Sequence, residues 1–370
     1  MSILIVGSGL TGSVIAQQYA EKTNNKVLII EKRDHIGGNC YDYIDDNDIL
    51  VSKYGAHIFH TKNTKIWNYI KQFTEWCKWE HKVVGKVDDK LVPIPVNIKT
   101  VNMLLDLNIT NEEEMNEWLM KNQVKYDEEL KNGEEAAKSR VGEVLYEKIF
   151  KNYTKKQWNK FPEELDAAVL QRIPVRNNYD DRYFNDEHQY LPKNGYTKLF
   201  ENMLDHENIT VELNTDYDTF IKTNDINIYE KIFFTGPIDQ YFKELPKLEY
   251  RSINFLWETH DTEYFQENSV VNYPDSNIDY TRIVEFKHFL NQKSNKTTIV
   301  KEYSTDKGDP YYPVINKKNL DLYDKYKELA NKNKNNIIFV GRLANFKYFN
   351  MVQAIENALD VFEKNICLNF

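Results

Sequence analysis

Three glycines spaced as GxGxxG limit the possible folds of this chain more than any other feature, because they lie between apolar segments near the N-terminus. They are Gly7, Gly9 and Gly12. The expected surroundings are a strand at 3–6, a helix at 13–20 and a second strand at 27–30 that leads into Glu31. In this arrangement a pyrophosphate can approach the glycine turn and the helix N-terminus, and the acidic residue can bind a ribose hydroxyl. We therefore predict a dinucleotide-binding α/β domain; the alternative is a chance glycine-rich turn in a non-binding α/β unit.

Composition narrows the remaining classes. The chain has 370 residues, 41% of them hydrophobic and 28% charged, which predicts a soluble globular protein of two or three domains. A net charge of −9 argues against non-specific binding to nucleic acid or anionic membranes. No apolar segment is long enough for a membrane helix, and the first one stops at Gly7, too early for a signal peptide. The three cysteines form no CxxC pair, so we expect a cytoplasmic protein with no metal site.

Glycines beyond the first motif point to the kind of dinucleotide. The pair Gly37 and Gly38 follows Glu31, and a late apolar strand runs into Gly341-Arg342 before a helix from about Met351. This second glycine turn resembles the FAD-binding family that includes amine oxidases and UDP-galactopyranose mutases. The resemblance implies that the turn lies beside the FAD diphosphate and that the late helix points its N-terminus at the flavin, favouring the anionic reduced ring.

The rest of the chain predicts two further domains. Residues 97–170 are polar with helical periodicity and predict packed amphipathic helices. Residues 171–190 and 246–312 contain short strand-like segments between polar turns and predict a mostly antiparallel sheet. The FAD-binding domain then comprises 1–96, 191–245 and 313–370. The expected fold is α/β with α+β inserts: a Rossmann-like domain, a helical bundle and an antiparallel substrate domain.

Several stretches in order along essentially the whole chain resemble the bacterial-type UDP-galactopyranose mutases. They are KYGAHIFHT, KNYTKKQWNKFPEEL, VLQRIPVRNNYDDRYF, TGPIDQYF, DYTRIVEFKHF, DPYYPV and FKYFNM. The resemblance implies interconversion of UDP-galactopyranose and UDP-galactofuranose without net redox. In the implied route, N5 of reduced FAD attacks the anomeric carbon, UDP leaves, the sugar ring opens through an iminium and recloses, and UDP adds back. An external reductant such as NAD(P)H or a flavin reductase, a homodimer, and a role in cell-surface polysaccharide biosynthesis are implied as well.

Arginine suits a diphosphate because its planar guanidinium is permanently charged. The residues alone favour surface ion pairs with Asp or Glu for Arg172 and Arg282. The resemblance instead places both on the diphosphate and gives both a catalytic role. It assigns further substrate contacts as follows: uracil stacking to Tyr153 with Phe150 beside it, phosphate contacts to Tyr183, Tyr312 and Tyr348, a nucleoside contact to Asn268 and a sugar contact to Trp158. Each aromatic side chain could instead serve packing.

The stretch KYGAHIFHT contains His57 and His60, three residues apart. This spacing can suit a metal site, an acid/base pair or a packed turn. The resemblance places the stretch along one face of the isoalloxazine, with His60 near the reactive edge, where it tunes N5 or its proton, and His57 towards the sugar. It also places Arg342 beside the ring, where a cation favours reduced flavin.

One position departs from the family pattern. The chain has Asn350 where the family usually has aspartate, between Tyr348-Phe349 and Met351. Asparagine can still cap the following helix, but it supplies no negative charge to flavin or substrate. We expect catalysis to survive with altered flavin electrostatics or sugar preference.

Three alternatives stay open at this stage. The enzyme could act on another nucleotide sugar, such as UDP-N-acetylgalactosamine, UDP-arabinopyranose or a fucose nucleotide. It could be an amine-oxidase-like flavin oxidoreductase, although an oxidase does not need a uridine diphosphate cradle. It could also be a non-catalytic nucleotide-sugar binder, against which the two glycine turns and Arg342 argue.

Overall fold

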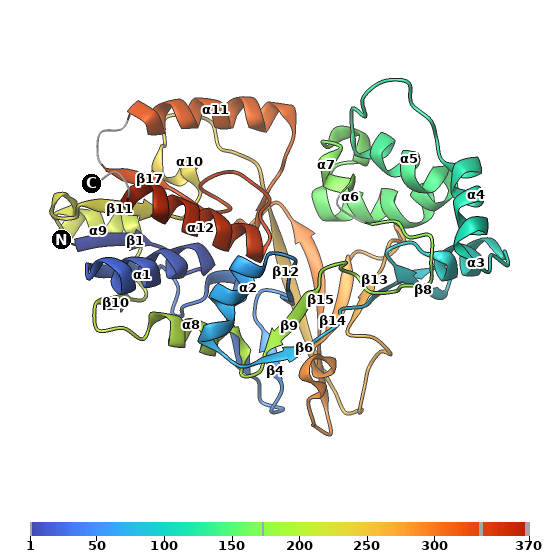
Figure 1. Cartoon of the computed structure of the whole chain (residues 1–370), viewed down its shortest axis with the longest axis horizontal. Coiled ribbons are helices and arrows are strands. Elements are labelled where there is room, and N and C mark those ends of the chain that lie inside the picture. The colour runs from blue at the N-terminus through green and yellow to red at the C-terminus, as the bar shows by residue number, and fades with distance from the viewer. Residues whose placement is uncertain (1, 172–173, 333–335, 367–370) are drawn as a thin grey trace.

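The computed structural model describes residues 2–171, 174–332 and 336–366. One part of the molecule, at the left of Figure 1, is built on a five-stranded parallel sheet. In sheet order the strands are β10 (Ile209–Glu212), β2 (Lys26–Ile30), β1 (Ser2–Val6), β11 (Lys231–Phe234) and β17 (Ile337–Phe339). Every neighbouring pair is parallel. The strand–turn–helix–strand pattern and the α/β fold expected from the sequence are confirmed.

Helices cover both faces of this sheet because its strands alternate their apolar side chains. Ile3 and Ile5 pack on one face with α1 (Leu10–Thr23), α8 (Gly195–Leu204) and α12 (Met351–Ile366). Leu4 points to the opposite face, against α9 (Tyr217–Thr223). A doubly covered parallel sheet of this kind binds its ligands beyond the carboxyl ends of the strands.

A seven-stranded sheet forms the second part of the molecule. In order its strands are β16 (Tyr312–Pro313), β12 (Tyr250–His260), β15 (Thr297–Thr305), β14 (Arg282–Glu285), β13 (Val270–Asn272), β7 (Val83–Val87) and β8 (Lys90–Ile94). Its pairs are antiparallel except β7–β13, which is parallel. The sheet is therefore mostly antiparallel, as the strand signals predict.

The strands are divided among the sheets differently from the sequence prediction. β7 and β8 belong to the large sheet, although we had expected residues 1–96 in the nucleotide domain. β9 (His188–Pro192) instead pairs with β5 (Phe59–Thr61) and β6 (Trp76–Lys78). A strand belongs to a sheet because it pairs with a strand from a distant segment. The alternation of side chains along one strand does not reveal which other strand it pairs with. A two-stranded ribbon completes the set, β3 (Asp42–Ile44) with β4 (Leu50–Ser52).

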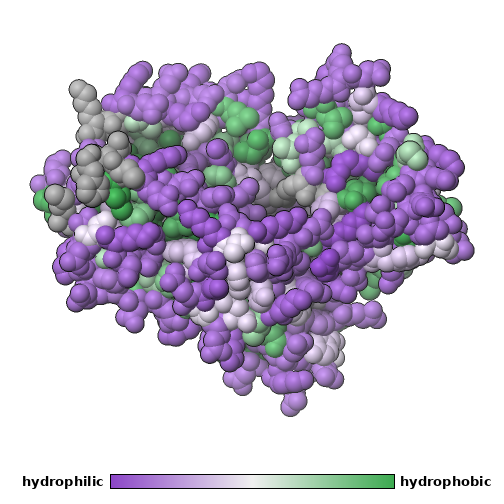
Figure 2. Space-filling model, viewed as in Figure 1, coloured by the Kyte–Doolittle hydropathy of each residue, from purple (hydrophilic) through white to green (hydrophobic). Residues whose placement is uncertain are grey.

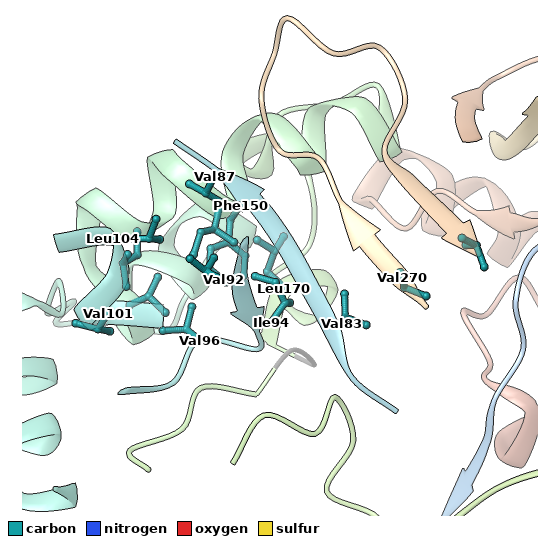
Figure 3. Close-up of a cluster of buried hydrophobic side chains, with 14 of the residues drawn as sticks. Val83, Val87, Val92, Ile94, Val96, Val101, Leu104, Phe150, Leu170 and Val270 are labelled. Atoms are coloured by element: carbon teal, nitrogen blue, oxygen red, sulfur yellow. The ribbon is translucent and has the colours of Figure 1, made fainter. Parts of the chain in front are cut away.

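Residues 98–171 form a helical lobe at one end of the large sheet (Figure 1). The lobe contains α3 (Ile98–Leu105), α4 (Glu112–Asn122), α5 (Gly133–Leu145), a π-helical turn (Tyr146–Lys151), α6 (Asn152–Trp158) and α7 (Ala168–Gln171). Its buried core joins the helices to β7 and β8 through Val87, Val92 and Phe150 (Figure 3). This packing fixes the helical lobe on the sheet.

In the described residues the remaining α-helices are α2 (Thr64–Ile70), α10 (Ile238–Tyr241) and α11 (Lys317–Lys332). None of the helices in the described ranges combines the length and apolar character that crossing a bilayer requires. The described residues also contain no cluster of three His, Cys, Asp or Glu side chains arranged to bind a metal.

Candidate active site

An open cavity of about 250 Å³ lies at the carboxyl ends of β1 and β2 and is lined by the glycine turn. Gly7 has φ +102°, and a Cβ on Gly12 would lie 2.0 Å from the Gly7 carbonyl oxygen, so both positions require glycine. No described side chain caps α1 at Gly9, which leaves the N–H groups of its first turn to a ligand. The turn is thus shaped for an anionic group at the helix N-terminus.

Glu31 is held rigidly at one side of this cavity. Its Oε2 accepts hydrogen bonds from the backbone N–H and the hydroxyl of Ser8, at 2.8 and 2.9 Å, and its Oε1 accepts from the N–H of Arg33 at 3.0 Å. The side chain is buried, but it still lines the cavity. A fixed carboxylate at the end of β2 fits a ribose hydroxyl.

The second glycine turn adjoins the first. Gly37 and Gly38 have φ +86° and +56°, and a Cβ on Gly38 would lie 2.9 Å from the Cα of Gly9. The two turns therefore contact each other through backbone atoms and line one cavity. A side chain at Gly38 would therefore clash with the backbone of the first turn.

The segment from β17 to the start of α12 lines the opposite side of the cavity. Gly341 (φ +100°) donates its N–H to the side chains of Asn345 and Asn357, both at 3.0 Å. Arg342 donates to the carbonyl oxygen of Tyr311 at 3.2 Å. Gly341, Arg342 and Met351 all line the cavity.

Asn350 is the N-cap of α12. Its Oδ1 accepts the N–H of Gln353 at 2.9 Å, while the Gln353 side chain accepts the N–H of Asn350 at 3.0 Å. The predicted capping is confirmed as a reciprocal capping box. Asn350 also lines the cavity. The position where the resemblance leads us to expect aspartate would therefore face a bound ligand.

The two histidines of KYGAHIFHT have different surroundings. Among the described residues, the cavity wall includes His57 and not His60. The Nδ1–H of His57 can donate to the carbonyl oxygen of Gly55 at 2.8 Å. Burial, followed by the positive charges of Arg342 and Arg282, lowers the pKa of His57 to about 4, so the ring is neutral at pH 7.

His60 lies 2.7 Å from the carboxylate of Asp186 through Nδ1, and its ring stacks on Phe184 at 3.5 Å. Burial lowers the pKa of His60, against the effect of Asp186. The cavity wall thus favours His57 over His60 as the histidine beside a cofactor. The role expected for His60 at the flavin edge stays a prediction.

A second group of expected residues gathers around Arg282 on β14. Its Nε donates to Oε2 of Glu302 at 2.7 Å, and Glu302 is 2% exposed. Burial lowers the pKa of Arg282, but the negative charge and the hydrogen bond of Glu302 act in the opposite direction, and the pKa of Arg282 is raised overall. The Tyr153 hydroxyl lies 3.5 Å from Oδ1 of Asn272, which pairs with Arg282 across β13 and β14. Burial raises the pKa of Tyr153, so its phenol stays neutral.

Three aromatic rings connect this group to the cavity. Trp158, Tyr312 and Tyr348 lie with their ring centroids 5.4 to 5.7 Å apart. Burial, with a contribution from Tyr348, raises the pKa of Tyr312 to about 12. The guanidinium of Arg342 lies 5.9 Å from the centre of the Tyr348 ring, within reach of a cation–π interaction. The cofactor cavity and the Arg282 group are therefore neighbours.

Three further expected substrate residues, Phe150, Tyr183 and Asn268, have other contacts, and a fourth, Arg172, lies outside the described residues. Phe150 is 8% exposed and packs in the core of the helical lobe. The side-chain amide of Asn268 donates to the carbonyl oxygens of Lys82 and Val270 at 3.0 and 2.8 Å, which accounts for its amide N–H groups. Tyr183 packs at right angles on Phe184 and lies near enough to Tyr153 to affect its pKa.

The sequence reasoning missed two residues of the Arg282 group. Asn272 stands opposite Arg282 on the neighbouring strand, and Glu302 forms an ion pair with Arg282. Oε1 of Glu302 is buried with no partner among the described residues. Glu302 could have been found from its place in the strand segment TTIVKEY. Side chains alternate along a strand, so Glu302 lies on the same face as buried Val300. A carboxylate at an inward position indicates a charged partner.

The fold and the site together define a dinucleotide-binding enzyme with a second, side-chain-built site beside its cofactor cavity. Residues 148–348 match a family model for UDP-galactopyranose mutase, and residues 5–73 match one for an NAD(P)-binding Rossmann-like domain. A protein named "Probable UDP-galactopyranose mutase" from Klebsiella pneumoniae is 39% identical over 97% of this chain and 93% of its own length. The chain belongs to the UDP-galactopyranose mutase family and is an isomerase.

Two further comparisons bear on substrate and fold. A dTDP-fucopyranose mutase from Escherichia coli is 37% identical over 97% of this chain and 96% of its own length. The crystal structure of a reduced UDP-galactopyranose mutase superposes with a TM-score of 0.79, covering 99% of this chain and 94% of the other at 15% identity. The superposition shows a shared fold.

Proposed function

We propose that this enzyme interconverts UDP-galactopyranose and UDP-galactofuranose by ring contraction with reduced FAD. The observation that carries the proposal is the continuity of the two sites. The Arg282 group meets the cavity through Trp158, Tyr312 and Tyr348, next to Arg342. A nucleotide sugar held by Arg282 would then place its sugar towards the cofactor.

The residues of the cavity fit FAD. The two glycine turns leave room for a diphosphate at the N-terminus of α1, and Glu31 suits a ribose hydroxyl. His57, Arg342 and Met351 would then surround the flavin. When bound and reduced, FAD supplies through N5 the electron pair that attacks the anomeric carbon. The uncapped α1 terminus and the positively charged Arg342 favour the negative charges of diphosphate and reduced flavin.

The side chains of the second site bind and hold the nucleotide. Arg282 is kept charged by Glu302, so it can bind the diphosphate in the substrate and hold UDP while it is detached from the sugar. Tyr312 stays protonated and can donate a neutral hydrogen bond to phosphate. Tyr153 offers its ring to uracil, and Trp158 contributes an apolar wall beside the sugar. Neutral His57 adds no positive charge beside the flavin.

The test is a panel of nucleotide sugars given to dithionite-reduced and oxidised enzyme, with products separated by chromatography. We expect UDP-galactofuranose to convert to UDP-galactopyranose only with reduced enzyme. The 37% identity to a dTDP-fucopyranose mutase makes dTDP-fucofuranose the second substrate to include, with UDP-N-acetylgalactosamine and UDP-arabinose forms beside it. If one of these had a higher kcat/KM than UDP-galactofuranose, the proposed substrate would be that nucleotide sugar. An oxidised sugar product would replace the mutase reaction with the oxidoreductase alternative.

Other parts of the proposal rest on the family resemblance. They are a cytoplasmic location, a homodimer, an external reductant such as NAD(P)H or a flavin reductase, and a place in cell-surface polysaccharide biosynthesis. Light scattering of the purified protein tests the dimer. Anaerobic mixing with NADH or NADPH, followed by the flavin absorbance, tests the reductant.

A further inference from the structure

The short helix α6 carries two substrate residues of the proposal, Tyr153 and Trp158, and between them a lysine with an unusual environment. The ammonium of Lys156 donates to the carbonyl oxygens of Asp275 and Ile278 at 2.9 Å and of Tyr280 at 3.2 Å. It makes a further short contact with the carbonyl oxygen of Tyr273. Four acceptors surround an ammonium that has three N–H donors, so its hydrogen-bonding capacity is filled.

These four carbonyls belong to one loop, residues 273–281, which joins β13 to β14. At the base of the loop, Asn272 pairs with Arg282, and the N–H of Tyr273 donates to the carbonyl of Thr281 at 2.9 Å. The loop packs on itself through the rings of Tyr273 and Tyr280, 4.9 Å apart. Lys156 therefore holds the loop that closes the Arg282 hairpin.

Lys156 is charged at neutral pH. Burial lowers its pKa to about 8, and the nearby carboxylates Asp275 and Asp279 act in the opposite direction. Hydrogen bonds from a charged donor are shorter and stronger than neutral ones. The link between α6 and the loop is therefore strongest while the lysine keeps its proton.

A separate attachment keeps α6 on the sheet. The carbonyl oxygen of Gln157 accepts from Arg251 Nε at 2.9 Å and from the Ser304 hydroxyl at 2.6 Å. Trp158, 3% exposed, packs in the cluster with Tyr312. A change at Lys156 should therefore loosen the loop without releasing the helix.

We propose that Lys156 is a positioning residue that fixes α6 against the Arg282 hairpin and so sets the base-stacking ring of Tyr153 relative to the diphosphate-binding arginine. The inference rests on the proposed function, because it needs one nucleotide to contact both residues. Uracil and diphosphate are covalently joined, so both contacts form together only when their separation is fixed in advance. Loss of the link lowers affinity for the nucleotide.

The test compares Lys156→Met with Lys155→Met in the full-length flavoprotein. Lys155 is the adjacent lysine of α6, and its ammonium contacts the Phe161 ring at 4.6 Å and the Asn159 carbonyl at 3.3 Å, away from the loop. We expect the UDP dissociation constant, measured by calorimetry, and KM to rise about tenfold in Lys156→Met, the loss of about one charge-assisted hydrogen bond. Flavin content should stay unchanged, and kcat should fall less than KM rises. Lys155→Met should behave as wild type, and Lys156→Arg should recover part of the affinity.

Two results would overturn the inference. One is Lys156→Met with wild-type affinity for UDP. The other is Lys156→Met with reduced flavin content and melting temperature in proportion to its lost affinity, which would make the lysine a general stabiliser of the fold. Failure of wild-type enzyme to bind UDP would instead contradict the proposed function, so the two failures are distinguishable.

Discussion

The cofactor cavity and the Arg282 group lie side by side but are built in opposite ways. One wall of the cavity is shaped by backbone, and it consists of two glycine turns, a helix N-terminus and one buried carboxylate, all from residues 7–38. The Arg282 group is shaped by side chains that α6, β13, β14, β15 and β16 bring together from residues 153 to 312. The first site depends on the absence of side chains, whereas the second depends on particular ones. Substitutions in the two sites should therefore have different effects on folding, flavin binding and catalysis.

The largest effect should come from Gly12→Ala. The new methyl group would lie 2.0 Å from the Gly7 carbonyl oxygen, and backbone cannot yield that far without moving α1 from β1. We expect no bound flavin and a large loss of folded protein, measured by the flavin-to-protein absorbance ratio and by thermal unfolding.

Gly9→Ala is the matched control. Its methyl group would meet nothing nearer than the Cα of Gly38 at 3.8 Å, so the fold should tolerate it. Because Gly9 lines the cavity, we expect weaker flavin binding at an unchanged apoprotein melting temperature. Equal stability of the two variants would contradict the backbone account of this cavity.

Arg282→Ala should leave flavin binding intact and break the other site. We expect kcat/KM to fall about a hundredfold, from the roughly 1.5–3 kcal/mol of a hydrogen bond to a charged group. The variant should also lose stability, because Glu302 would remain buried without its partner. Steady-state kinetics, flavin content and thermal unfolding measure the three effects.

Arg282→Lys sharpens this prediction. Lysine keeps the charge beside Glu302 but loses the planar fork, so stability should recover more than kcat/KM does. If both variants kept wild-type kcat/KM, Arg282 would not bind the diphosphate.

Acid should destabilise the fold through two histidines, His57 at the cavity wall and His81, which is buried against Phe184 and Phe289. Burial lowers the pKa of His57 to about 4 and of His81 to about 3, with positive neighbours adding to both shifts. Between these values and about 6.5 the unfolded chain binds more protons than the native one, so the free energy of unfolding falls as pH drops. Each histidine contributes about 2.5 kcal/mol over this range, so we expect roughly 5 kcal/mol to be lost between pH 7 and pH 4.5.

Urea unfolding at pH 7, 5.5 and 4.5 measures this loss. His81→Asn should reduce the slope of stability against pH, since it removes one of the titrating groups. A slope unchanged in His81→Asn would mean that other groups cause the acid sensitivity.

The smallest effect should come from Asn350→Asp. Asparagine and aspartate are similar N-caps, so the capping box with Gln353 and the melting temperature should be retained. The added negative charge at the cavity should lower the flavin reduction potential and change turnover a few-fold. Spectroelectrochemistry and steady-state kinetics measure both, and if neither changed, the charge at position 350 would have no part in catalysis.

The same contrast explains what could be predicted from the sequence. The α/β fold, the strand bounds around Gly7 and the cap at Asn350 were predictable, because each depends on neighbours within a few residues. The pairing of β7 with β13 and the ion pair of Arg282 with Glu302 were not, because they join segments far apart along the chain. The nucleoside contact of Asn268 stays a prediction, and only strand register shows that Asn272 stands opposite Arg282. For His57 and His60, three residues of spacing did not reveal which ring faces the cavity.

The central claim is that the two sites act together in a reaction without net redox. Its most direct test is to count turnovers per flavin in anaerobic, pre-reduced enzyme with UDP-galactofuranose while recording the flavin spectrum. We expect many molecules of UDP-galactopyranose per flavin, with the steady-state spectrum staying that of reduced flavin. A single turnover per flavin, or an oxidised or reduced sugar formed in step with a change in flavin oxidation state, would contradict it.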